Sequence, residues 1–227
     1  MSSPNLKATI GQLKKSKAEL EGTSMKDVIE ASTNFKVVPY SVVHKPLLAE
    51  LSTIANRIEK KYSSEPITRS LYEERLNEER LKKKKVNAFR NNEVGTFCEL
   101  LIKDDFDENK TKFKLLTDVL PLGGSGYPDL KVVTASDPIF LEIKATSRPG
   151  SGSPRDFYYT PGSASDRKID ADGLHVLIGF VTEQENRGFV IKGFKLVDVS
   201  KIKVGLKPEF NTDNPGIYNE NTLIKLD

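Results

Sequence analysis

Three charged residues stand at spacings that could serve hydrolytic chemistry. Asp129 opens one strand-like segment, and Glu142 and Lys144 lie in the next, 13 and 15 positions further on. Because side chains alternate along a strand, Glu142 and Lys144 point to the same side, with head groups about 7 Å apart along one rim. A strand–turn–strand unit of this length can place the carboxylates of Asp129 and Glu142 side by side.

Paired carboxylates of this kind indicate a bound cation. Two neighbouring carboxylates repel each other, and each is hard to ionise unless a cation lies between them. Mg²⁺ prefers oxygen ligands and usually takes only one or two protein carboxylates. We therefore expect Asp129 and Glu142 to bind Mg²⁺, with the carbonyl of Ile143 as a third ligand. Lys144 would orient or deprotonate an attacking water and stabilise the phosphate during phosphodiester hydrolysis.

The elements that must position these residues follow from periodicity. Residues 91–227 begin with a core-facing helix, whose apolar residues follow the i, i+3, i+4 pattern: Val94, Phe97, Cys98, Leu101 and Ile102. Strand-like segments come next, separated by Gly, Pro, Asn and Asp: 112–120, 129–134, 139–146, 174–182 and 189–199. This order predicts an α/β fold with a central mixed sheet flanked by helices.

Residues 1–90 are predicted to form a separate helical region. Apolar residues recur every three or four positions: Leu6, Ile10, Leu13, Leu47, Leu51, Ile54 and Ile58. Ser24 with Asp27, and Ser70 with Glu73, fit the start signals of two further helices. The region holds 18 Lys and Arg against 11 Asp and Glu, a net charge of +7, whereas residues 91–227 carry −4. This asymmetry favours a DNA-gripping or dimerisation region beside a carboxylate-rich site, with a solvated helical surface as the alternative.

Composition excludes several other classes of protein. The chain has 227 residues with 37% hydrophobic and 30% charged, enough for one buried core. No run approaches the ~18 apolar residues of a membrane span, and the N-terminus lacks the pattern of a secretory signal. The single cysteine, Cys98, cannot form an internal disulfide or a Cys-based zinc site, which fits the reducing cytoplasm.

The chain resembles a known family at these residues. Pro128-Asp129 followed by Glu142-Ile143-Lys144 is similar to the signature of the PD-(D/E)xK nuclease superfamily, and segments 156–159, 174–180 and 206–211 look like type II restriction endonucleases. The resemblance covers roughly residues 91–200. It implies a mixed sheet flanked by helices, Mg²⁺ dependence and a homodimer that cuts double-stranded DNA at a specific, palindromic site.

Many such nucleases carry one more acidic residue on the helix before the sheet. Glu93 and Glu99 are both candidates, since both lie at the margins of the apolar stripe. The segment from Gly95 to Glu99 resembles the Gly-x-x-x-Glu helix of related nucleases, so we expect Glu99 to be the fourth catalytic residue. The alternative is an ordinary surface salt bridge.

Candidate DNA contacts gather in the loop 147–170. Arg and Ser side chains reach phosphates and base edges, and tyrosines can stack, so we expect DNA contacts from Arg148, Arg155, Tyr158, Ser163, Arg167 and Lys168. Lys83 and Lys84, in a run of four lysines, are candidates for non-specific phosphate contact. The alternatives are a mobile loop with incidental arginines and a solvated helix end.

Two other features have structural interpretations. We expect His175, inside an apolar strand, to be a core histidine rather than a catalytic base. The run Gly123 to Gly126 lacks the Lys-Ser/Thr of a phosphate-binding loop, so we expect it to be the turn that delivers Asp129.

Two rival functions share this pattern. The first is a repair, recombination or nicking nuclease built on the same core. The second is a DNA-binding module without catalysis, against which the intact trio of Asp129, Glu142 and Lys144 argues.

Overall fold

A computed structural model describes residues 3–78, 89–124, 126–149, 159 and 168–207. The α-helices are α1 (Ser3–Leu20), α2 (Met25–Thr33), α3 (Lys45–Tyr62), α4 (Arg69–Glu78) and α5 (Asn91–Asn109). The strands are β1 (Thr23–Ser24), β2 (Leu116–Pro121), β3 (Leu130–Thr134), β4 (Ile139–Thr146), β5 (Leu174–Glu185), β6 (Gly188–Asp198) and β7 (Lys203–Val204). Short 3-10 helices occupy Val42–His44, Lys110–Lys112 and Val199–Lys201.

The chain divides into two compact units. The smaller unit comprises residues 1–24 and 203–227, and in it β1 pairs with β7 in antiparallel fashion after the helix α1. The larger unit comprises residues 25–202 and holds the remaining described elements. The predicted boundary at residue 90 falls inside the larger unit, because α3 belongs to the same hydrophobic core as α5 and the sheet. Whether residues 1–90 grip DNA or mediate dimerisation stays a prediction.

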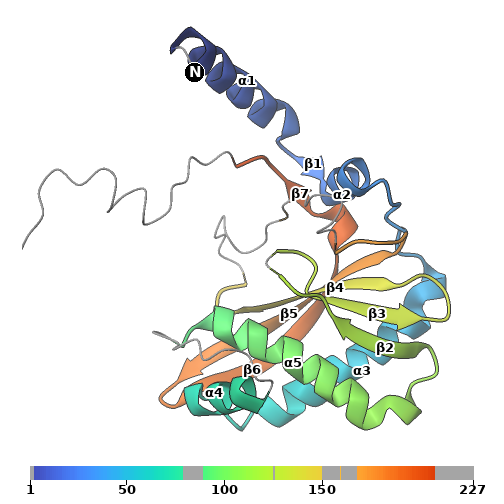
Figure 1. The fold of residues 1–227 in the computed structure, drawn as a ribbon. Helices are drawn as coiled ribbons and strands as arrows, with labels where there is room; N and C mark the ends of the chain where they lie inside the picture. Colours follow the sequence, from blue (N-terminus) through green and yellow to red (C-terminus); the bar gives the residue numbers. More distant parts are fainter. Residues whose placement is uncertain (1–2, 79–88, 125, 150–158, 160–167, 208–227) are drawn as a thin grey trace, which may run out of the picture. The chain divides into compact units, whose positions relative to one another are not determined.

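The larger unit is built on a five-stranded mixed sheet in the order β2-β3-β4-β5-β6 (Figure 1). β4 and β5 run parallel, and the other neighbouring pairs run antiparallel. Parallel neighbours require a crossover of a dozen or more residues, and residues 147–173 provide one here. The predicted central mixed sheet flanked by helices is confirmed.

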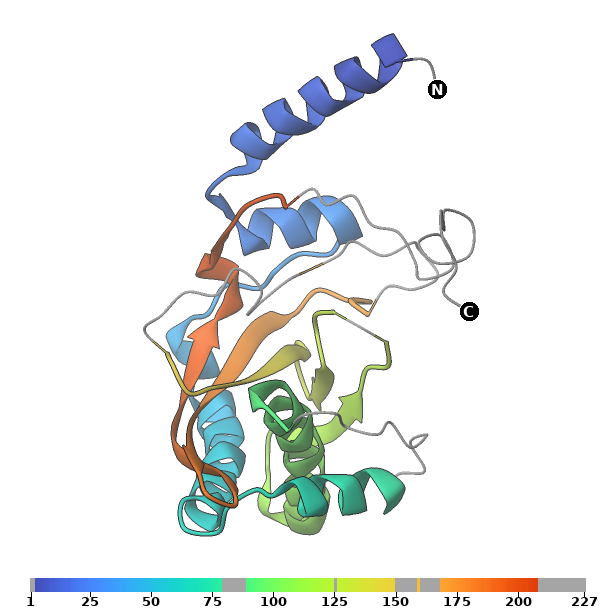
Figure 2. The same ribbon diagram turned by 90° about the vertical axis from the view of Figure 1, so that its left-hand side faces the viewer.

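One face of the sheet packs on two helices. α3 and α5 contact each other and cover strands from both edges of the sheet (Figures 1 and 2). Most predicted apolar positions of both helices are buried there, including Leu51, Ile54, Phe97 and Ile102, whereas Leu101 is only partly buried. Two bidentate ion pairs fasten α5 in place: Arg57 of α3 to Asp105, and Arg75 of α4 to Asp104.

The central strand β4 is buried on both faces. Leu141 and Ile143 join the core under α3 and α5. Side chains alternate along a strand, so Phe140 and Glu142 point to the opposite face, where they are 0% and 2% exposed. The clean alternation predicted for residues 139–146 holds, and the Glu142 carboxylate is buried instead of lying on a solvated rim.

The start of α4 differs from its prediction. The hydroxyl of Thr68 accepts a hydrogen bond from the N–H of Leu71 at 3.2 Å, so Thr68 caps the helix rather than Ser70. Ser70 already lies within the first turn, and its hydroxyl bonds to that of Thr68. Among the described residues, no helix is long and apolar enough to cross a membrane.

Candidate active site

The pairing of β3 with β4 brings the two predicted carboxylates together. Leu130 lies opposite Leu141, and the N–H of Asp129 donates to the carbonyl of Leu141 at 3.0 Å. The next position along this register sets Asp129 beside Glu142. The two acidic groups interact electrostatically, as the strand–turn–strand arrangement predicted.

Asp129 is held by its main chain and by its side chain. The N–H of Leu122 donates to the carbonyl of Asp129 at 2.8 Å, which closes the loop between β2 and β3. The N–H of Ile143 donates to Oδ2 of Asp129 at 2.8 Å. Oδ1 is therefore the oxygen that these main-chain bonds leave for another ligand.

Glu142 and Lys144 form an ion pair between a buried carboxylate and a partly exposed lysine. Nζ of Lys144 lies 2.6 Å from Oε1 of Glu142, whose side chain is 3% exposed. The two head groups are thus much closer than the spacing of about 7 Å along the strand, which both long side chains can bridge. The other oxygen, Oε2 of Glu142, is buried and has no hydrogen-bond partner in the described part of the chain.

Burial and crowding perturb the acidic groups. Burial raises the pKa of Glu142 to about 7, with the Asp129 carboxylate adding to the effect and Lys144 opposing it. Burial also raises the pKa of Asp129, although the N–H of Ile143 and the nearby lysine oppose it. Burial lowers the pKa of Lys144, but the surrounding carboxylates raise it above its ordinary value overall. Acids that resist ionisation together are typical of a site built for a cation.

The two candidate acids of α5 have different surroundings. Glu93 accepts a hydrogen bond from the N–H of Arg90 at 2.8 Å and so completes the first turn of the helix. Burial raises the pKa of Glu99 to about 8, and the charges of Asp129 and Glu142 add to the shift. The helix axis approaches β4 closely, since a Cβ atom on Gly95 would lie 3.7 Å from the nitrogen of Ala145. Glu99 therefore shares the electrostatic field of the site, whereas the contact described for Glu93 is the bond at the start of the helix.

The donor set fits a hard divalent cation. Within the described ranges, no group of three or more His, Cys, Asp or Glu side chains is arranged to hold a metal ion. The site offers the carboxylates of Asp129 and Glu142, and Oε2 of Glu142 is buried without a hydrogen-bond partner in the described part of the chain. Mg²⁺ is commonly bound by one or two protein carboxylates. In a strand, the N–H and C=O of one residue point to the same side, so the Ile143 carbonyl faces the side of Asp129. It is available there as the third oxygen.

The predicted DNA-binding residues are only partly described. Arg148 is exposed just beyond the end of β4. Lys168 lies near the end of the loop 147–170. Its ammonium donates to the main-chain carbonyls of Gly124, Gly126 and Pro128 instead of projecting outward. Arg155, Tyr158, Ser163, Arg167, Lys83 and Lys84 lie outside the described residues.

An aromatic stack beside the site escaped the sequence prediction. The ring of His175 stacks on Phe140 at 5.0 Å and on Tyr127 at 5.8 Å between centroids. The Tyr127 oxygen lies 2.5 Å from Nδ1 of His175. Burial lowers the pKa of His175 to about 3, so the ring is neutral and belongs to the core, as predicted. The stack contains Tyr127 and Phe140, which stand two positions before Asp129 and Glu142. In the sequence, only the aromatic residue types at these two positions indicated such a stack.

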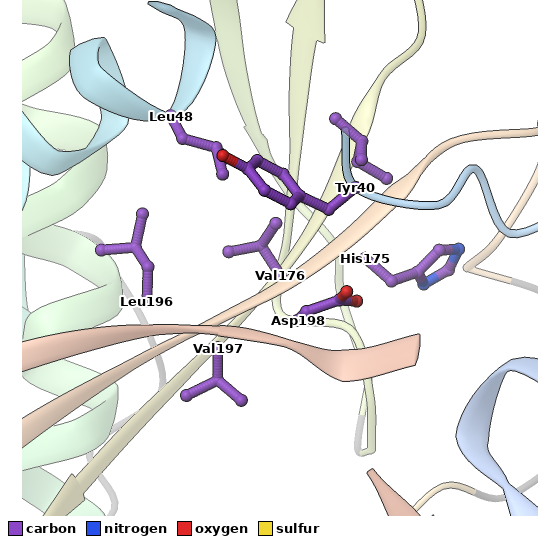
Figure 3. Close-up of a pocket in the computed structure, with 8 residues that line it drawn as sticks. Tyr40, Leu48, His175, Val176, Leu196, Val197 and Asp198 are labelled. Carbon is purple, nitrogen blue, oxygen red and sulfur yellow. The ribbon is translucent and has the colours of Figure 1, made fainter. Parts of the chain in front are cut away.

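A separate apolar pocket of about 260 Å³ lies near the start of β5. Tyr40, Leu48, Val176 and Leu196 surround it, and His175 and Asp198 also line it, although the His175 ring points away from the other four side chains (Figure 3). None of its lining residues is a predicted site residue.

Two comparisons with known proteins match this chain to type II restriction enzymes. The family model described as the type II restriction enzyme MjaV family matches residues 19–221. The type II restriction enzyme MjaV of Methanocaldococcus jannaschii is 30% identical over 141 residues, which cover 59% of this chain and 61% of the relative. The alignment thus spans about three fifths of that relative's length. No solved structure matches the chain.

Proposed function

We propose that this chain, which belongs to the type II restriction enzyme MjaV family, is a Mg²⁺-dependent endonuclease that cuts double-stranded DNA at a specific site. The observation that carries the proposal is the adjacency of the partly buried Asp129 and the buried Glu142, with Lys144 paired to the Glu142 carboxylate. The matched residues 19–221 include all three.

In this proposal Oδ1 of Asp129, Oε2 of Glu142 and the Ile143 carbonyl hold Mg²⁺. When bound, Mg²⁺ supplies a Lewis acid that polarises a phosphoryl oxygen and lowers the pKa of water. Lys144, already fixed against Glu142, presents its positive charge where the phosphate gains negative charge. Glu99, whose raised pKa keeps a proton available near neutral pH, is placed to accept or return a proton at the edge of the site.

The proposal extends to the residues that contact DNA and to the oligomeric state of the enzyme. Arg148 lies two residues after β4 and four after Lys144, so it is well situated to contact DNA next to the reacting phosphate. Arg155, Tyr158, Ser163 and Arg167 extend this proposed recognition segment, and Lys83 and Lys84 provide proposed phosphate contacts. We propose a homodimer, whose twofold symmetry would be matched by a palindromic recognition site.

Plasmid digestion tests the proposal. Plasmid DNA of known sequence is incubated with the protein and Mg²⁺, and the fragment ends are sequenced. We expect discrete fragments whose ends share one palindromic motif, and no cleavage when EDTA replaces Mg²⁺. Cleavage confined to branched or mismatched substrates, or binding without cleavage, would contradict the proposal.

A further inference from the structure

The ammonium of Lys168 lies in a cup of main-chain carbonyls. It donates to Gly124 at 3.1 Å, to Gly126 at 2.6 Å and to Pro128 at 2.9 Å. An ammonium group has three donors, so these bonds use all of them. A lysine that serves DNA phosphates would instead keep donors free for the phosphate oxygens.

The shape of the cup depends on two glycines. Gly124 has a φ of 86° and Gly126 a φ of 82°, values that L side chains rarely adopt. These conformations turn alternate carbonyls toward one point, and the bond from Leu122 to Asp129 closes the loop behind them. The carbonyls that bind Lys168 therefore end one residue before the proposed metal ligand Asp129.

The residues after Lys168 also contact β3, the strand that follows Asp129. Ile169 is 2% exposed, which anchors the segment in the core. The carboxylate of Asp170 accepts hydrogen bonds from Lys131 at 2.6 and 2.8 Å. Residues 168 and 170 thus hold the chain immediately before and after Asp129.

From these contacts we propose that Lys168 is a positioning residue, which fixes Asp129 for metal binding through the carbonyls of Gly124, Gly126 and Pro128, and is not a phosphate contact. The inference rests on the proposed metal site at Asp129 and Glu142. Removing a side chain that orients a metal ligand typically weakens metal affinity about 10–100-fold. Removing a phosphate contact instead lowers the salt dependence of DNA binding.

Two substitutions separate these roles. Lys168→Met keeps the chain length but removes every donor. Lys168→Arg keeps the charge and can bind a phosphate, but its planar fork cannot converge on three carbonyls around one nitrogen. Lys192→Met on β6, whose lysine side chain is 45% exposed, is the matched control.

Two quantities are measured for each variant. Mg²⁺ affinity comes from the rise of the unfolding temperature with Mg²⁺ concentration. Salt dependence comes from the binding of a short DNA duplex in EDTA at several salt concentrations. We expect both Lys168 variants to lose at least about tenfold in Mg²⁺ affinity with an unchanged salt slope, and Lys192→Met to match wild type.

Three results would overturn the inference. A salt slope lower by about 1 in Lys168→Met, restored in Lys168→Arg, would make Lys168 a phosphate contact. Unchanged Mg²⁺ affinity in both variants would remove the positioning role while leaving the metal site intact. If wild type itself is not stabilised by Mg²⁺, the proposed metal site fails, and this inference fails with it. Should Lys168→Met not fold, Lys168→Gln, which keeps two donors, is judged by the same two quantities.

Discussion

Nζ of Lys144 lies 2.6 Å from Oε1 of Glu142, whereas the second, buried oxygen of the same carboxylate has no hydrogen-bond partner among the described residues. This relationship divides Glu142 between two cations. Lys144 takes one oxygen, and a divalent ion between the carboxylates would take the other. Each prediction below depends on how the removal of charge or of a hydrogen bond changes that arrangement.

Glu142→Gln should abolish DNA cleavage and stabilise the metal-free protein at pH 8. Burial and Asp129 raise the pKa of Glu142 to about 7, so ionisation at pH 8 costs folding free energy that a neutral amide does not. A gain of ~1 kcal/mol would raise the unfolding temperature by roughly 2–4 °C in a domain of this size. Thermal unfolding in EDTA measures this shift.

The control is the same comparison at pH 5. Glu142 is then already protonated in the folded state, so wild type and Glu142→Gln should unfold at nearly the same temperature. A variant that is less stable than wild type at pH 8 would show that the ionised carboxylate is favourable without metal.

The metal-free protein should lose stability as pH rises from about 4.5 to 8. Burial raises the pKa of Glu142 to about 7 and that of Glu99 to about 8, above the ordinary carboxyl value. In that window the folded state binds more protons than the unfolded state, so stability falls with pH. Mg²⁺ should reverse the trend, since its binding requires deprotonated carboxylates and strengthens as pH rises.

Unfolding temperatures between about pH 5 and 8.5, with and without Mg²⁺, measure both effects. The double variant Glu99→Gln/Glu142→Gln should flatten the metal-free dependence. Stability that rises steadily across this window in EDTA would contradict the raised pKa values of both residues.

Glu99→Gln and Glu93→Ala should affect different properties. Glu99 shares the electrostatic field of Asp129 and Glu142, so its loss should lower the cleavage rate about 10²–10⁴-fold, as loss of an acid–base group does. Glu93 bonds to the N–H of Arg90 at the start of α5, so its loss should mainly lower stability, by ~0.5–1.5 kcal/mol. Single-turnover cleavage and thermal unfolding of both variants distinguish the roles, and the reverse order of activities would assign the fourth acid to Glu93.

Tyr127→Phe should destabilise the protein by ~1–3 kcal/mol. The substitution removes the phenolic oxygen that lies 2.5 Å from Nδ1 of His175 and leaves that buried nitrogen without its partner. Tyr40→Phe, at a residue that is 42% exposed, is the control and should change stability far less. Denaturant unfolding compares the two, and equal stabilities for both variants would mean that the bond to His175 contributes nothing.

Local patterns in the sequence were sufficient to predict much of the site. Alternation placed Glu142 and Lys144 on one side of residues 139–146, and the observed β4 has these bounds. The Pro128-Asp129 turn and the length of the following hairpin were sufficient to pair Asp129 with Glu142. These features depend on contacts between neighbouring strands, which sequence spacing determines directly.

Contacts between distant segments could not be predicted in this way. Lys168 is 40 residues from Pro128. Its three partners are main-chain carbonyls, so no side-chain type in the sequence indicates that these bonds form. The composition of the loop 147–170 therefore suggested a DNA contact for Lys168. His175 could be predicted as buried from its apolar neighbours, but its bond to Tyr127, 48 residues away, depends on the strand register.

The location of a bound divalent ion tests the central claim most directly. Crystals of the protein grown with Mn²⁺, which takes similar oxygen ligands, would reveal the ion by anomalous diffraction. We predict one peak at coordination distance from Asp129, Glu142 and the Ile143 carbonyl, and no such peak in Glu142→Gln. An ion bound elsewhere, or no ion between these carboxylates at saturating Mn²⁺, would contradict the assignment of the site.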